Sequence, residues 1–113
     1  MDYSMTTTTT IPYRFQEDEI LFHLQEYVDA TYSGHYTNKQ KKEIQVIDIW
    51  ESLGSLESTA RDNALKYLLR FGKKEGKNSK DLYKAMHYII LMLYCLRKEP
   101  ANASASGKWN NPY

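Results

Sequence analysis

Apolar residues recur at the helical period in four segments of this chain, and glycine or proline closes each segment. The segments are residues 17–32, 41–53, 58–71 and 79–98. They are followed by Ser33-Gly34, Gly54, Gly72 and Pro100. Glycine and proline are the usual residues just beyond a helix, and an apolar stripe every three to four residues is typical of a helix with one buried face. With no segment that alternates like a strand, the sequence predicts an all-α fold, a small bundle of about four helices.

The expected helices differ in how much of their surface is apolar. In residues 58–71, Ser58 is expected to cap the helix start. The face expected to be buried consists of Ala64, Leu65, Leu68 and Leu69. Residues 86–96 are apolar nearly all round, so we expect the last helix to lie at the centre of the core or of a subunit interface.

The length of 113 residues allows a single domain. We expect a helical domain over residues 17–98. Residues 1–16 include five consecutive threonines, and residues 99–113 are rich in Ala, Ser, Asn and Gly. Both ends lack apolar periodicity, so we expect flexible N- and C-terminal tails.

Charge is distributed unevenly, although the net charge is only +1. Residues 61–84 contain eight Lys or Arg against three Asp or Glu, a local charge of +5, whereas the part before Tyr32 is acidic. A chain without an overall basic excess is not typical of sequence-specific nucleic-acid binding. We therefore expect an attractive surface for small anions within residues 61–84.

The sequence lacks the motifs that several kinds of functional site require. The single cysteine, Cys95, lies among apolar neighbours, which favours a buried thiol in a reducing compartment. There is no apolar run long enough for a membrane span, no glycine-rich phosphate loop and no spacing typical of a zinc site. The interpretation is a protein without metal, cofactor or membrane anchor, and whether it is an enzyme stays open.

One polar face in the third expected helix carries the strongest functional signal. It consists of Asn63, Lys66, Tyr67 and Arg70. Their spacing of three and four residues makes these side chains project from one side of a helix. Two cations suit phosphate, and an amide with a phenol suits a nucleobase. A polar stripe is also the ordinary solvent-facing side of an amphipathic helix, so two interpretations remain open.

Four blocks of the sequence resemble the SaV-like family of small bacteriophage proteins, which includes the coliphage T-seven-type nucleotide kinase that lacks the usual phosphate loop. The blocks are Gly34-His35-Tyr36, residues 43–48, residues 63–74, and residues 81–85 with Tyr88. They occur in the same order over roughly residues 34–88. One position departs from the pattern, because Asp62 stands where these proteins usually have a glycine.

The resemblance implies a phage protein that binds a nucleotide in the cytoplasm of the infected host, and a homo-oligomer. It adds His35, Tyr36 and Lys74 to the expected ligand-binding residues. The leading hypothesis is a non-catalytic binder that sequesters a nucleotide signal of host immunity. Two alternatives stay open: a nucleoside monophosphate kinase using the same face, and an inhibitor that binds a host protein.

Overall fold

The expected all-α fold is confirmed by a computed structural model, which describes residues 11–33, 38–73 and 76–99, the side chains of residues 38–44 excepted. Within these ranges the chain forms four helices and no strand. They are α1 (Glu17–Tyr32), α2 (Asn38–Ser52), α3 (Leu56–Arg70) and α4 (Ser79–Arg97). Most of both expected tails, residues 1–10 and 100–113, lies outside the described residues.

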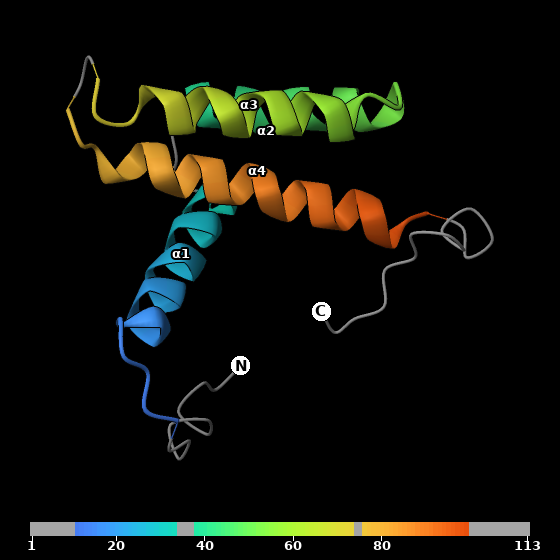
Figure 1. The fold of residues 1–113 in the computed structure, drawn as a ribbon. Helices are drawn as coiled ribbons and strands as arrows, with labels where there is room; N and C mark the ends of the chain where they lie inside the picture. Colours follow the sequence, from blue (N-terminus) through green and yellow to red (C-terminus); the bar gives the residue numbers. More distant parts are fainter. Residues whose placement is uncertain (1–10, 34–37, 74–75, 100–113) are drawn as a thin grey trace.

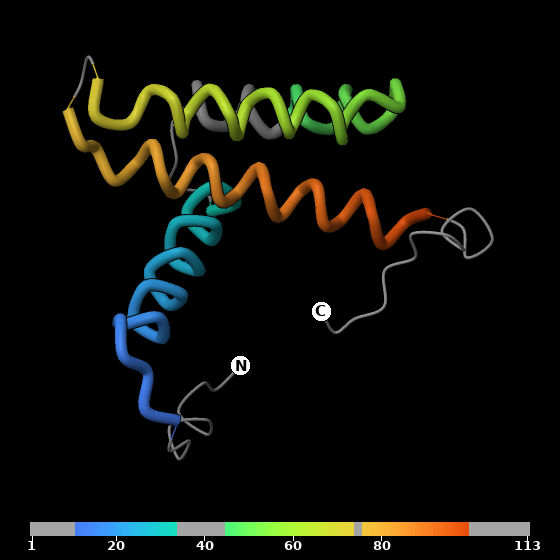
Figure 2. The backbone as a smooth tube through the Cα atoms, viewed as in Figure 1, coloured from blue at the N-terminus to red at the C-terminus, as the bar shows by residue number. Residues whose placement is uncertain are grey.

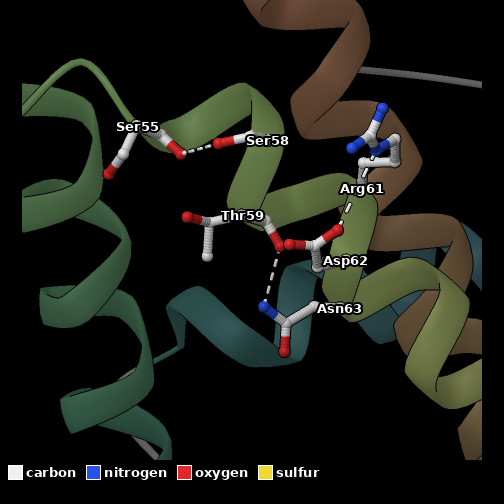
Figure 3. Close-up of polar contacts among 6 residues, drawn as sticks. All are labelled: Ser55, Ser58, Thr59, Arg61, Asp62 and Asn63. Carbon is white, nitrogen blue, oxygen red and sulfur yellow. Dashed lines mark hydrogen bonds and ion pairs between the residues drawn. The ribbon is translucent and has the colours of Figure 1, made fainter.

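The expected bounds of α1 agree with the structure, and those of α4 agree to within one residue. The predicted cap of α3 was wrong: the helix begins at Leu56, and Ser58 already lies inside it. The hydroxyl of Ser58 donates to the carbonyl of Ser55 (3.3 Å) instead of accepting from a backbone amide (Figure 3). The reason is the short turn after α2, where Gly54 has φ +77° and allows the next helix to start at once.

Helices α3 and α4 form an antiparallel hairpin at the centre of the structure (Figure 1). The buried apolar residues of the described chain are Leu56, Ala60, Ala64 and Ala85. Three of the four are alanines, and small side chains allow two helix backbones to approach closely along their length. The hairpin therefore depends on close packing of small groups rather than on a core of large side chains.

The expected buried face of α3 was only partly right. Ala64 is buried, but Leu65, Leu68 and Leu69 are exposed to 50%, 48% and 67%. The helix is rotated so that its alanines face α4. Leu65 and Leu69 therefore point away from the contact, while Leu68, four residues after Ala64, lies at its edge. Among the described residues no large side chain is fully buried.

The other two helices contact the hairpin over short stretches (Figure 2). Helix α2 contacts α3 and is joined to α4 through Glu51, whose carboxylate accepts from the hydroxyl of Tyr94 and from Nζ of Lys98 (3.0 Å). Helix α1 crosses α4 on the side away from α3. Its Tyr27 ring stacks on Tyr83 and meets His87 edge-on, with ring centroids 5.9 Å and 6.1 Å apart. Helix α4 thus lies between α3 and α1.

Candidate functional site

The hairpin brings the end of α3 beside the beginning of α4, and Tyr67 lies at the middle of this junction. Three cations approach its ring: Nζ of Lys66 at 4.8 Å from the centroid, Nζ of Lys84 at 5.5 Å and Cζ of Arg70 at 6.0 Å. The ring of Tyr88 is nearly parallel to that of Tyr67, with an interplanar angle of 11° and centroids 6.1 Å apart. We call these five residues the tyrosine–cation cluster.

The cluster combines two kinds of binding surface, the faces of aromatic rings and a group of cations. The faces of the phenol rings attract cations and planar aromatic groups. The two ammonium groups and the guanidinium attract anions, and the guanidinium also presents a planar fork of donors to a phosphate. Both tyrosines are half-buried while Lys66 and Arg70 are exposed, so the charged groups stand at the surface above rings held by the hairpin.

Arg70 links the cluster to Asp81, the third residue of α4. Nε of Arg70 lies 3.6 Å from Oδ1 of Asp81, whose side chain is only 5% exposed. The second oxygen, Oδ2, is buried and has no hydrogen-bond partner among the residues described. A buried carboxylate is costly without a counter-charge, so this ion pair holds the guanidinium at the α3–α4 junction and makes Asp81 depend on it.

Asn63 takes a different place from the one expected. It lies one turn before Tyr67 on the same helix, but its Nδ2 donates to the carbonyl of Thr59 (2.8 Å), as Figure 3 shows. Its amide N–H is thus used inside α3. The structure unites Lys66, Tyr67 and Arg70, and it leaves Asn63 at the margin of the cluster.

The remaining expected site residues, His35, Tyr36 and Lys74, lie outside the described residues. Conversely, the prediction from the helix face missed Lys84, Tyr88 and Asp81, which all come from α4. Lys84 and Tyr88 are four residues apart and so share one side of a helix, which was a visible signal. Their contact with Tyr67 could not be predicted from the sequence, because it depends on how α3 and α4 are aligned.

His87 lies next to the cluster on α4 and is buried, with 8% of its surface exposed. It meets Tyr27 of α1 edge-on, and Lys84 precedes it on its own helix. Burial, and then the positive charge of Lys84, lower the pKa of His87 below its ordinary value of 6.5.

This shift predicts that the fold loses stability as the pH falls below 6.5. The unfolded chain then binds a proton at His87 before the folded chain does, so the free energy of unfolding decreases until the folded pKa is passed. Urea unfolding of the wild type and the His87→Phe variant between pH 7 and 5 would measure this decrease. A plot of the free energy of unfolding against pH should have a shallower slope for the variant. Equal slopes would contradict the assigned role of His87.

The described residues form neither a cluster of metal ligands nor a membrane-spanning helix. No three His, Cys, Asp or Glu side chains gather there in a way that holds a metal ion. No helix in the described ranges has both the length and the apolar composition needed to cross a bilayer.

Comparison with known proteins identifies a family but no characterised relative. The profile of a protein family described as a protein of unknown function, DUF3310, matches residues 30–90 of the 113. The match runs from the end of α1 into α4 and includes the whole tyrosine–cation cluster. No curated protein and no solved structure matches the chain.

Proposed function

Because this chain belongs to the DUF3310 family, whose function is unknown, we propose its function from its own geometry: it binds a nucleotide at the tyrosine–cation cluster. The observation that carries this proposal is the set of three cations around the Tyr67 ring, with Tyr88 parallel to it. A nucleotide pairs a polyanion with a planar base, and cations beside aromatic faces provide for both parts.

The proposed orientation follows from exposure. The phosphate lies over Lys66 and Arg70, which are exposed, and over Lys84 from the neighbouring helix. The base lies on the phenol rings, where stacking contributes about 1–3 kcal/mol per base and tolerates different bases. The cluster therefore explains affinity for nucleotides in general and does not select one base.

The resemblance to SaV-like phage proteins supports a biological setting for this binding. We propose that the protein acts in the cytoplasm of an infected bacterium as a homo-oligomer that sequesters a nucleotide signal of host immunity. In this role the protein needs affinity but no turnover, and the cluster provides binding groups for phosphate and base.

Isothermal titration of the full chain with nucleoside mono-, di- and cyclic phosphates tests the proposal. At least one should bind with micromolar affinity, and Lys84→Ala should weaken it at least about tenfold, because a hydrogen bond to a charged group contributes about 1.5–3 kcal/mol. Lys80→Ala is the matched control, since Lys80 lies one turn earlier on α4 and outside the cluster. Absence of binding, or equal losses in both variants, would refute it.

The same samples distinguish binding from catalysis. Incubation with a deoxynucleoside monophosphate and a triphosphate donor, followed by chromatography of the nucleotides, detects any diphosphate formed. Binding without diphosphate supports a binder that sequesters its ligand. Diphosphate formation that is lost in Lys84→Ala would instead favour the monophosphate kinase.

A further inference from the structure

Three further lysines lie between the tyrosine–cation cluster and the turn that joins α3 to α4. Lys73 follows the end of α3, Lys77 precedes the start of α4, and Lys80 is the second residue of α4. All three are exposed, and none of them forms an ion pair with another described residue. They lie at the end of the hairpin where the two helices are joined (Figure 1). The positive charge of the cluster therefore continues to that end of the hairpin.

These lysines adjoin the cluster on both helices. Lys80 lies four residues before Lys84, so the two share one side of α4. Nζ of Lys84 lies 5.5 Å from the centroid of the Tyr67 ring, so this side of α4 belongs to the surface on which the cluster lies. At the end of α3, the backbone amide of Lys73 donates to the carbonyl of Arg70 (3.0 Å). The lysines thus extend the cluster rather than form a separate patch.

The only acid in the described part of residues 66–88 is withdrawn from this surface. The side chain of Asp81 is 5% exposed, and its Oδ1 lies 3.6 Å from Nε of Arg70. The guanidinium therefore offsets the negative charge of Asp81 below the surface. The exposed charge between the cluster and the turn is positive in the described residues, which suits an anion longer than one phosphate group.

A row of cations that begins at aromatic rings suits a single strand of nucleic acid. Phosphates repeat along such a strand, and its unpaired bases stack on aromatic side chains. Lys80 and Tyr88 are eight residues apart, or about 12 Å along the axis of α4. We propose that the nucleotide at the cluster belongs to a single-stranded oligonucleotide, whose further phosphates lie over Lys73, Lys77 and Lys80. This inference rests on the proposed function, since one nucleotide of the strand occupies the cluster.

The aromatic rings favour a single strand over a duplex. In a duplex the bases are paired and stacked on one another, so they do not reach the rings of Tyr67 and Tyr88. A duplex gains only the attraction between its phosphates and the lysines. Stacking on a ring tolerates every base, so the strand is bound without regard to its sequence.

Fluorescence anisotropy of the full chain with a labelled deoxythymidine oligonucleotide of about twelve nucleotides tests the proposal. The oligonucleotide should bind at least about tenfold more tightly than thymidine monophosphate, because more phosphates contact cations. Lys77→Ala with Lys80→Ala should weaken oligonucleotide binding at least about tenfold and leave monophosphate binding unchanged. The slope of log K against log salt concentration should become shallower by about 1.4 in this variant, since each phosphate contact of a single strand contributes about 0.7.

The control is Arg14→Ala with Arg61→Ala, which removes the same charge from exposed positions away from the turn. It should leave both affinities unchanged. A uridine strand of equal length distinguishes RNA from DNA, because the tighter of the two strands identifies the natural ligand. An annealed duplex should bind at least about tenfold more weakly than the single strand.

Three results would overturn the proposal: an oligonucleotide that binds no more tightly than the monophosphate, a duplex that binds as well as the single strand, or equal losses in the two double variants. Each of these leaves the proposed function intact as long as the monophosphate binds. If neither the monophosphate nor the strand binds, the proposed function itself fails. The two failures are thereby distinguished in one set of measurements.

Discussion

Arg70→Ala is expected to lower the free energy of unfolding by about 1–3 kcal/mol and to weaken nucleotide binding at least about tenfold. The stability loss arises because Asp81, only 5% exposed, loses the cation beside its Oδ1. The binding loss arises because the guanidinium near the Tyr67 ring is one of the groups assigned to phosphate. Urea unfolding and isothermal titration of the same protein measure the two losses.

A second substitution separates these two effects. Adding Asp81→Asn to Arg70→Ala removes the unpaired charge while keeping the side-chain shape, so most of the lost stability should return. Binding should not return, since the phosphate still lacks its guanidinium. If nucleotide affinity recovered together with stability, Arg70 would act only by holding the hairpin together, and its assignment to the ligand would be wrong.

Ala60→Leu is expected to destabilise the fold by about 1–3 kcal/mol, because the larger side chain does not fit between α3 and α4. Ala60 has no exposed surface, and Ala85 on the facing helix is 1% exposed. For a domain of this size, each kcal/mol lowers Tm by roughly 4–8 °C. Thermal unfolding followed by circular dichroism provides the measurement.

Arg61→Leu is the matched control for this prediction. It introduces the same side chain at the next position of α3, where the native side chain is 65% exposed. Its effect should stay within about 0.5 kcal/mol. A stability loss equal to that of Ala60→Leu would mean that leucine disfavours α3 itself, and that the close contact of the alanines is not what stabilises the hairpin.

The positions of the helices were predicted from local sequence signals. Predicted and observed helix starts agree best where the capping residue was unambiguous. The start of α4 was predicted at residue 79, where the helix begins, and the side chain of Asn78 accepts from the backbone amide of Lys80 (2.9 Å). The start of α3 was missed by two residues, since Ser55 and Ser58 are both acceptable caps and only the turn at Gly54 selects between them.

The buried side of α3 shows where local reasoning fails. Hydrophobicity favoured Leu65, Leu68 and Leu69 over Ala60, yet Ala60 is buried and the leucines are exposed. Transfer free energy increases with side-chain area and therefore favours the larger residues. A close helix contact favours the smaller ones instead, and the distance between two helices is not a property of either sequence segment.

By itself, the sequence determined the helical class, the approximate limits of the helices, and the presence of Lys66, Tyr67 and Arg70 on one helix face, because hydrogen bonding and side-chain spacing within a helix are local. Only the tertiary structure decided that Lys84 and Tyr88 join them and that Asp81 is buried beside Arg70. These neighbours come from a second helix. Their positions depend on the rotation and alignment of α4 against α3, which the packing of alanines in both helices sets.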